Sequence, residues 1–312
     1  MQTMLFAAGK GTRLKPLTDI IPKALVPIAD KPLLQIVTER LAAAGADSVV
    51  VNVHHHAAQM FNFIKLLRLA LPQVTIQVSD ESDELLETGG AIKKAIPLFR
   101  RSEPILIHNC DILSNLDLKE FYNESQECDA EALLLVSERT TQRYLVFDDD
   151  MRLVGWTNIQ TGEVRSPYKE LAAFNGRKDM DWRKEGLRLY AFAGIHCFSP
   201  ELFPLMKEWP DRFPIMDFYL HHLAEHKIKG RLAEKIGLAT VIGGGVSNVF
   251  DRCFRGFVVD YINVKAGPLE KIVFNLGDAM IGAGGFLIAG SELLRTAART
   301  FRKTEETGGD LG

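Results

Sequence analysis

A short apolar run near the start of the chain breaks into a glycine-rich segment, and this pairing constrains the fold more than any other feature. Residues 4–8 read Met-Leu-Phe-Ala-Ala, and residues 9–14 read Gly-Lys-Gly-Thr-Arg-Leu. Glycines after a strand let backbone N–H groups approach a phosphate chain, because no Cβ stands in the way. Arg13 and Lys23 add the positive charge that a pyrophosphate needs. The segment therefore predicts a nucleotide site, although a short Gly-x-Gly by itself is as often an ordinary strand-to-helix turn.

Helical and strand-like patterns alternate along the first half of the chain. The expected helices are 33–44, 57–71 and 90–98, and the expected strands are 48–53, 75–78 and 104–108. This alternation predicts a Rossmann-like α/β domain with a mostly parallel sheet and helices on both faces. Such sheets bind ligands at the carboxyl ends of their strands. The glycine-rich segment and the stretches 54–56, 87–90 and 109–111 follow strands or their connections, so they can converge on one edge of the sheet.

Composition fits an enzyme for most of the chain. At 312 residues, with 25% charged residues and a net charge of −3, the chain can form one large domain or two and offers no electrostatic case for a nucleic-acid partner. The four cysteines, Cys110, Cys128, Cys197 and Cys253, lack a CxxC spacing, so neither a zinc site nor a disulfide framework is indicated. The chain starts directly with the first strand, so we expect no cleaved signal peptide and a cytoplasmic N-terminal domain.

The whole N-terminal string resembles the sugar-1-phosphate nucleotidyltransferase family. The family pattern is Gly-x-Gly-Thr-Arg-Leu, then Pro-Leu-Thr, then Pro-Lys-Ala-Leu-x-Pro, and these pieces stand in order at 9–14, 16–18 and 22–27. The resemblance covers residues 1 to about 228 and is closest to the short subgroup of N-acetylmuramate 1-phosphate uridylyltransferase and mannose-1-phosphate guanylyltransferase. It implies transfer of a nucleoside monophosphate from a nucleoside triphosphate to a sugar 1-phosphate, with release of pyrophosphate, in nucleotide-sugar or cell-wall biosynthesis.

Asp111, directly after the strand 104–108, is the predicted metal residue. Mg²⁺ favours one or two carboxylates together with phosphate oxygens and water, and the resemblance implies a metal ligand at this position. The alternative is a helix N-cap or turn aspartate. The resemblance also implies that Arg13 stabilises the leaving pyrophosphate and that Lys23 bridges the α-phosphate and the sugar phosphate, which makes Arg13, Lys23 and Asp111 the expected catalytic residues.

Further ligand contacts are implied by the same resemblance. The expected nucleotide-binding residues are Ala8, Gly9, Gly11, Thr12, Arg13, Lys23, Glu87, Gly89, Gly90 and Asn109. The segment 87–90 is expected against the nucleobase, with a plain loop-to-helix turn as the alternative. Gly155 and Gly194 are expected to face the sugar. Three adjacent histidines, 54–56, would point to alternate sides of a strand end, so we do not expect them to hold one metal ion.

One part of the family pattern is missing. Members finish with a Trp-x-Asp-x-Gly segment whose aspartate is the second metal ligand, and no such string follows Ile228. The transferase is therefore expected to turn over slowly or not at all, unless another carboxylate such as Asp217 completes the site.

A second resemblance begins after residue 230. The segments 248–252, 256–262 and 274–278 resemble, in this order, the C-terminal half of lipoprotein signal peptidase (signal peptidase II), a membrane aspartyl protease, over about 236–290. It implies that Asp260 and Asp278 form the catalytic pair. The implied supporting residues are Asn248, Asp251, Arg252 and Asn275. Two facing carboxylates can share one proton, so that one acts as a base and the other as an acid. The alternative is a pair of solvated loop aspartates.

The expected organisation is therefore a nucleotidyltransferase-like domain at 1–228, a partial signal-peptidase-like segment at 229–295 and a polar tail at 296–312. The middle part is expected to be short, hydrophobic and helical, with one full candidate span at 272–290 and a stub at 236–250. It could associate with the inner membrane through 236–290, with the basic stretch 227–235 on the cytoplasmic side. A membrane protease, or a fused and inactive remnant of both enzymes, stands as the alternative function.

Overall fold

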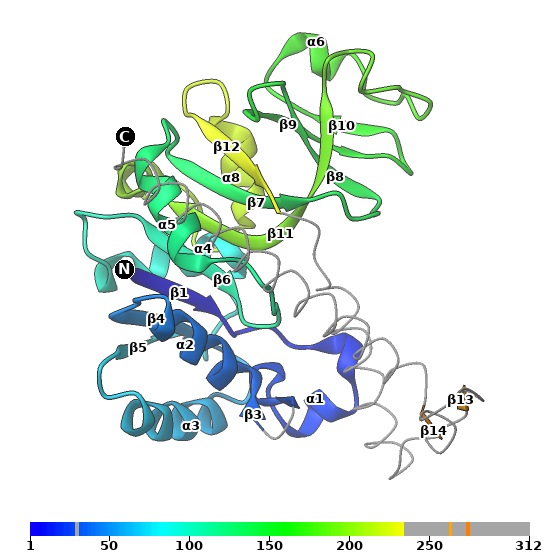
Figure 1. The fold of residues 1–312 in the computed structure, drawn as a ribbon. Helices are drawn as coiled ribbons and strands as arrows, with labels where there is room; N and C mark the ends of the chain where they lie inside the picture. Colours follow the sequence, from blue (N-terminus) through cyan, green and yellow to red (C-terminus); the bar gives the residue numbers. More distant parts are fainter. Residues whose placement is uncertain (29–30, 234–261, 264–272, 275–312) are drawn as a thin grey trace, which may run out of the picture. The chain divides into compact units, whose positions relative to one another are not determined.

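The computed structural model describes residues 1–28, 31–233, 262–263 and 273–274 (Figure 1). The chain divides into two units, Met1–Ile112 with Leu116–Glu234, and Leu113–Asn115 with Lys235–Gly312. The described elements of the second unit are β13 (Ile262–Asn263) and β14 (Val273–Phe274), an antiparallel pair with Ile262 opposite Phe274. All further elements belong to the first unit.

The first unit alternates strands and helices along its first half and then continues mainly as strands. Its strands are β1 (Gln2–Phe6), β2 (Pro27–Ile28), β3 (Lys31–Pro32), β4 (Ser48–Val53), β5 (Thr75–Asp80), β6 (Ile105–Asn109), β7 (Ala132–Ser137), β8 (Arg143–Phe147), β9 (Leu153–Asn158), β10 (Glu163–Arg165), β11 (Arg188–Phe198) and β12 (Ile228–Leu232). Its helices are η1 (Thr12–Leu14), α1 (Leu17–Ile20), η2 (Lys23–Leu25), α2 (Leu33–Ala43), α3 (Ala57–Ala70), α4 (Glu87–Ala95), η3 (Ile96–Leu98), α5 (Leu118–Glu127), α6 (Lys169–Ala172), η4 (Pro200–Leu202), α7 (Phe203–Met206) and α8 (Ile215–His222).

Ten of these strands form one mixed sheet. Its order is β10-β9-β8-β11-β6-β1-β4-β5, and β7 pairs with β11 and with β12. The nucleotide-site half, β6-β1-β4-β5, is entirely parallel, with Met4 of β1 opposite both Val50 and Ile107. β11 then pairs antiparallel with β6, and β8, β9 and β10 extend the antiparallel half. The α/β class expected from the sequence is confirmed.

Burial on both faces explains the composition of the central strands. Every residue of β4, which reads Ser-Val-Val-Val-Asn-Val, is buried, as expected for a parallel strand covered by helices on two sides. Helix α3 buries Met60, Ile64 and Leu67, which recur at helical spacing along one face. In Figure 1, α2 and α3 lie beside β1, β4 and β5. The parallel half is therefore a rigid base for the loops at its carboxyl edge.

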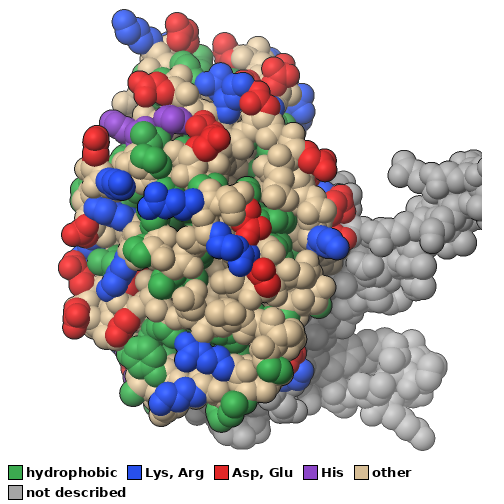
Figure 2. Space-filling model, turned by 90° about the vertical axis from the view of Figure 1, so that its left-hand side faces the viewer, with side chains coloured by type: hydrophobic (Ala, Val, Ile, Leu, Met, Phe, Trp, Pro, Cys, Tyr) green, Lys and Arg blue, Asp and Glu red, His purple; other side chains and the backbone are tan. Residues whose placement is uncertain are grey.

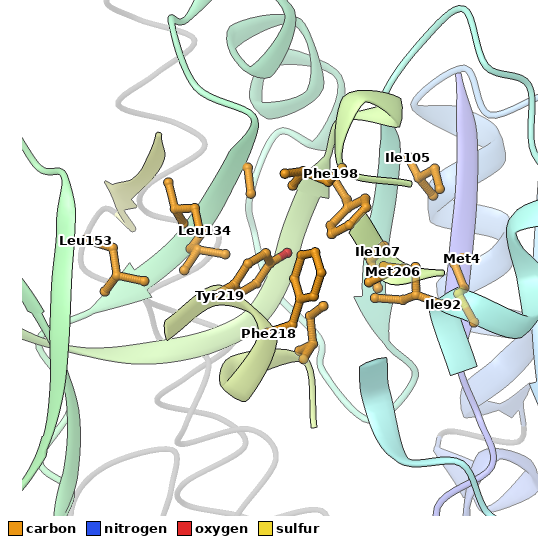
Figure 3. Close-up of a cluster of buried hydrophobic side chains, with 14 of the residues drawn as sticks. Met4, Ile92, Ile105, Ile107, Leu134, Leu153, Phe198, Met206, Phe218 and Tyr219 are labelled. Carbon is orange, nitrogen blue, oxygen red and sulfur yellow. The ribbon is translucent and has the colours of Figure 1, made fainter. Parts of the chain in front are cut away.

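The main core lies between the sheet and helices α4 and α8. Figure 3 shows Phe218 and Tyr219 of α8 pointing toward Phe198 of β11, and their ring centroids lie 6.1 and 6.2 Å from that of Phe198. The other labelled core residues are Met4, Ile92, Ile105, Ile107, Leu134, Leu153 and Met206. Burying one such side chain stabilises the fold by about 1.5 to 3 kcal/mol, so this cluster fixes α8 against the sheet.

The strand β12 bears on the expected domain boundary. β12 pairs in parallel with β7 and begins at Ile228, so the expected boundary after residue 228 falls inside this strand. Arg231 of this strand is paired within the unit, since it contacts Glu120 at 3.1 Å and Glu124 at 2.6 Å. No helix in the described part of the chain is long and apolar enough to cross a membrane. The candidate span 272–290, apart from β14, and the stub 236–250 lie outside the described residues.

Charged side chains on the outer surface are of both signs. On the face drawn in Figure 2, lysine and arginine side chains are interspersed with aspartate and glutamate rather than gathered into a region of one sign. Several of them pair within the unit, as Arg100 and Asp47 do at 2.8 Å. Exposed pairs of this kind contribute little to stability, typically about 0 to 1 kcal/mol each.

Candidate active site

A pocket of about 440 Å³ opens at the carboxyl edge of the parallel strands. It lies where β1 ends at Phe6 and β6 ends at Asn109, so its walls are the first residues after each strand. Its lining residues are Phe6, Ala7, Ala8, Gly9, Lys23, Ala24, Leu33, Asn52, Leu85, Glu87, Thr88, Asn109, Cys110, Asp111 and Pro214. The structure thus brings together Ala8, Gly9, Lys23, Glu87, Asn109 and Asp111 of the predicted site residues.

Two glycines of the loop after β1 have different surroundings. A Cβ on Gly9 would meet no atom of the described residues within 4 Å, so the backbone there faces open space in the pocket wall. Gly11 has φ of 62°, and a Cβ there would lie 2.6 Å from Cγ2 of Thr18. The hydroxyl of Thr18 donates to the carbonyl of Gly11 at 2.9 Å, which closes the loop on itself. Gly9 therefore leaves room at the pocket, whereas Gly11 permits the left-handed turn behind it.

Lys23 and Asp111 face each other across the pocket. Lys23 begins η2, Asp111 follows β6, and Nζ of Lys23 donates to Oδ2 of Asp111. Their side chains are 32% and 40% exposed, so both can reach a ligand. No group of three or more histidine, cysteine or carboxylate side chains placed to hold a metal occurs in the described residues. The Asp111 carboxylate opens onto this pocket and fits Mg²⁺, which takes much of its coordination from substrate phosphates and water.

Asn52 is a pocket residue that the sequence analysis missed. Its side chain is 3% exposed, and its Oδ1 accepts from the backbone N–H of Ala7 at 2.7 Å and of Ala8 at 3.3 Å. The signal was a polar residue among the valines of β4, because a buried polar side chain is kept only where it is hydrogen-bonded.

The segment 87–90 forms the first turn of α4, which starts earlier than the expected helix 90–98. Glu87 and Thr88 line the pocket, but Gly89 and Gly90 donate their N–H groups to the carbonyl of Phe213 at 2.8 and 3.2 Å. A Cβ on Gly89 would lie 2.2 Å from the Phe213 ring. The space beside these two glycines is therefore occupied by residues 211–213 of the chain and is not open to a ligand in the pocket.

The two glycines expected at the sugar do not line the pocket. Gly194 has φ of 75° at an irregularity in the pairing of β11 with β7, and a Cβ there would lie 2.7 Å from Nδ2 of Asn109. Gly155 lies in β9, where a Cβ would lie 3.0 Å from the carbonyl oxygen of Arg165. Gly194 thus touches the pocket wall through Asn109, and Gly155 makes room for β10. Asp217 of α8 also lies outside the lining and pairs with Arg165 at 2.8 Å.

The histidines 54–56 form a loop after β4, in which His55 and His56 make a turn. The turn places the rings of His55 and His56 together, with Nε2 atoms 3.0 and 3.1 Å from the Thr18 carbonyl oxygen. His54 instead contacts the carbonyl oxygen of Glu81 at 2.7 Å. These side chains brace the segment that closes the glycine loop.

Two buried groups beside the pocket are held neutral. Burial lowers the pKa of His108 to about 4 and raises the pKa of the Cys110 thiol well above its ordinary value. A neutral thiol is a poor nucleophile, so Cys110 contributes an apolar surface to the pocket.

The remaining predicted residues fall into two groups. Thr12 and Arg13 lie in η1, and neither Gly11 nor Thr12 lines the pocket. The protease-like residues lie outside the described residues: Asn248, Asp251, Arg252, Asp260, Asn275 and Asp278.

The parallel sheet with a glycine loop, a lysine and an aspartate at its carboxyl edge defines a nucleotidyltransferase-type α/β domain. Residues 2–150 match the family model described as nucleotidyl transferase. The resemblance to sugar-1-phosphate nucleotidyltransferases is thereby confirmed. Residues 214–294 match the signal peptidase (SPase) II family model, so the second resemblance is confirmed as well. Its first residues are α8 and β12 of the first unit.

Curated relatives support the same family. N-acetylmuramate alpha-1-phosphate uridylyltransferase of Caulobacter vibrioides is 41% identical over 108 residues, covering 35% of this chain and 44% of the relative. Mannose-1-phosphate guanylyltransferase 1 of Arabidopsis thaliana is 33% identical over 139 residues, covering 44% of this chain and 38% of the relative. UTP–glucose-1-phosphate uridylyltransferase of Synechocystis is 42% identical over 288 residues, covering 88% of this chain and 65% of the relative. The chain thus covers less than two thirds of the length of each of these relatives.

Solved structures share the fold at low sequence identity. A UDP-glucose pyrophosphorylase in complex with UDP-glucose gives a TM-score of 0.57 at 17% identity, covering 82% of this chain and 99% of that one. HddC of Yersinia pseudotuberculosis in complex with GMP-PN gives a TM-score of 0.53 at 21% identity, covering 74% of this chain and 90% of that one.

Proposed function

We propose that this protein transfers a nucleoside monophosphate from a nucleoside triphosphate to a sugar 1-phosphate and releases pyrophosphate. The observation that carries the proposal is the convergence of Gly9, Lys23 and Asp111 on one pocket at the carboxyl edge of the parallel strands. The relatives named above carry the names of enzymes for glucose, mannose and N-acetylmuramate 1-phosphates, which supports a sugar 1-phosphate as the acceptor. Because nucleoside triphosphates are the donors, we place this activity in the cytoplasm.

The reaction needs alignment and charge neutralisation more than a protein nucleophile. A phosphate oxygen of the sugar 1-phosphate attacks the α-phosphorus, and the bond to the pyrophosphate breaks. In this proposal the open backbone at Ala8 and Gly9 receives the triphosphate, Lys23 neutralises charge on the α-phosphate and the sugar phosphate, and Arg13 acts on the leaving pyrophosphate. Asp111 would hold Mg²⁺, which neutralises phosphate charge when bound.

A pyrophosphate-release assay on the full chain tests the proposal. The assay would pair UTP, GTP, CTP, ATP and dTTP with glucose 1-phosphate, mannose 1-phosphate and N-acetylmuramate 1-phosphate, with Mg²⁺ present. We expect pyrophosphate to be released only when the preferred nucleoside triphosphate and the preferred sugar 1-phosphate are both present. Release that needs no sugar 1-phosphate, or no triphosphate binding by calorimetry, would contradict the proposal.

The missing Trp-x-Asp-x-Gly segment leads to an expectation for the turnover rate. Asp111 is the one residue of the pocket lining to which the proposal assigns the metal, while Glu87 is assigned to the nucleobase side. We therefore expect nucleotide binding to persist while turnover is low, since a metal acts most strongly on the transition state. Grafting that segment after Ile228 should raise the rate without changing triphosphate affinity. An already high rate that the graft leaves unchanged would mean that another carboxylate completes the site.

A second candidate activity rests on the signal peptidase II match at residues 214–294. In this reading Asp260 and Asp278 act as an aspartyl pair in a segment associated with the inner membrane. We propose that this module alone does not cleave prolipoprotein, because the family's N-terminal helices have no counterpart in the chain. Expression in cells depleted of signal peptidase II tests this, with Asp278→Asn as the control. Lipoprotein processing that is restored by the chain and lost in the Asp278→Asn variant would establish an active protease instead.

A further inference from the structure

Glu81 is a buried carboxylate beneath the pocket, and neither the motifs nor the proposed reaction accounts for it. It directly follows β5 and is 0% exposed. Within the described residues no cation forms an ion pair with it, and its side chain instead accepts from Nδ2 of Asn52 at 2.8 Å and from the N–H of Leu86 at 3.3 Å. Burial raises its pKa above the ordinary value. Carboxylates are almost never fully buried without a charge partner, so this one is kept at a cost in stability.

The two groups that Glu81 binds belong to two separate segments of the chain that contribute to the pocket wall. Asn52 receives the N–H groups of Ala7 and Ala8, which begin the glycine loop. Leu86 lies between Leu85 and Glu87, which also line the pocket. Glu81 therefore ties both segments to the end of a single strand.

The chemistry of the contact fixes how Asn52 points. A carboxamide has an oxygen that accepts and an NH₂ that donates, and the two ends can exchange by rotation. An ionised carboxylate can only accept, so Glu81 holds the NH₂ end and leaves Oδ1 for the two loop amides. The reversed rotamer would place donor against donor at Ala7 and acceptor against acceptor at Glu81.

We propose that Glu81 is a positioning residue of the nucleotide site, which sets the glycine loop through Asn52 and the wall at Leu85 and Glu87 through Leu86. The inference rests on the proposed function, because the ordered loop is what receives the triphosphate. A loop ordered before the ligand arrives loses less entropy on binding, so the expected gain is in triphosphate affinity and in alignment at the α-phosphorus.

A polarity swap in the full chain tests the arrangement. Asn52→Asp places two carboxylates against each other, and Glu81→Gln places an NH₂ group against the N–H of Leu86. In the double variant Asn52→Asp/Glu81→Gln, the new amide at position 81 donates to the new carboxylate at position 52 and accepts from the N–H of Leu86. Every contact is then restored, and only the contact between positions 52 and 81 has its donor and acceptor exchanged. The control is Ser79→Ala, a buried residue of β5 whose hydroxyl has no hydrogen-bond partner in the part of the chain that the structure describes.

Each variant is assayed for triphosphate affinity by calorimetry, for kcat and KM by pyrophosphate release, and for thermal stability. We expect Asn52→Asp to weaken triphosphate binding by about 10-fold or more, the equivalent of one charged hydrogen bond, and the double variant to recover most of it. The control should match the unmutated protein.

Two results would overturn the inference. One is single variants whose affinity and kcat/KM stay within about 2-fold of the unmutated protein. The other is a double variant that regains thermal stability but neither affinity nor kcat/KM, because the contact would then be structural only. If the unmutated protein binds no triphosphate, the proposed function falls, and this inference falls with it.

Discussion

Lys23 and Asp111, far apart in the sequence, form an ion pair across the mouth of the nucleotide pocket, with Nζ of the lysine on Oδ2 of the aspartate. The two groups that the proposed reaction assigns to the α-phosphate and to the metal therefore neutralise each other before a ligand binds. Mg²⁺ and Lys23 compete for the same carboxylate, so nucleotide and metal should bind together, with the lysine passing to the phosphates as the metal takes its place.

Removing the lysine should separate metal binding from turnover. In Lys23→Ala we expect Mg²⁺ to bind the nucleotide-free protein roughly 2- to 5-fold more tightly, because a competing partly exposed pair is worth about 1 kcal/mol or less. The rate should fall by about 100-fold, as when one transition-state contact is lost. Calorimetric Mg²⁺ titration and pyrophosphate release give the two values. Lys31→Ala, which breaks the exposed pair with Glu39 outside the pocket lining, is the control and should change neither. Weaker Mg²⁺ binding in Lys23→Ala would refute the competition.

The two loop glycines should respond differently to the same substitution. Gly9→Ala adds a methyl in open space, so folding stability should be unchanged while triphosphate affinity falls. Gly11→Ala forces an alanine into a left-handed backbone conformation and brings its Cβ too close to Thr18. We therefore expect a loss of about 1 to 3 kcal/mol in the free energy of unfolding as well. Urea unfolding and triphosphate calorimetry on both variants check this. Equal stability loss in the two variants would show that the loop has a different conformation.

The sequence was most informative where one local signal determined one structural outcome. The alternation of apolar strands and helices predicted the parallel half of the sheet, and the glycine motif placed the pocket at the end of β1. It was least informative where a side chain depends on partners distant in the chain. Gly89 looked like a ligand contact, yet its neighbour is Phe213, and no local pattern links these two positions. Asn52 and Glu81 meet only because β4 and β5 are neighbours in the sheet.

The packing of Gly89 leads to a direct test. Gly89→Ala would drive a methyl into the Phe213 ring, and overpacking of this kind typically costs about 1 to 3 kcal/mol. We expect Gly89→Ala to lower the free energy of unfolding by this amount and Gly89→Ala/Phe213→Leu to lose less than the sum of its two single variants. Urea unfolding of the four proteins forms the cycle. Strict additivity would mean that the two residues are not in contact.

The last prediction concerns acid stability and rests on two buried histidines. Burial lowers the pKa of His196 to about 3 and that of His108 to about 4, against about 6.5 in an unfolded chain. Between these values the unfolded chain binds more protons than the folded one, so the stability that is present above pH 6.5 is lost as the pH falls toward 4. Each histidine should contribute a loss of roughly 2 to 3 kcal/mol by pH 4.

His196 allows the contribution to be isolated. Among the described residues neither of its ring nitrogens has a hydrogen-bond partner, so His196→Leu removes a titrating group without breaking a polar contact there. Its ring stacks on Phe192 with centroids 5.5 Å apart, so some packing is lost at every pH. We expect a lower stability at pH 7.5 but a shallower decline toward pH 4 in the variant, measured by urea unfolding at several pH values. Parallel pH profiles for the two proteins would show that His196 accepts a proton in the folded state and would contradict the prediction.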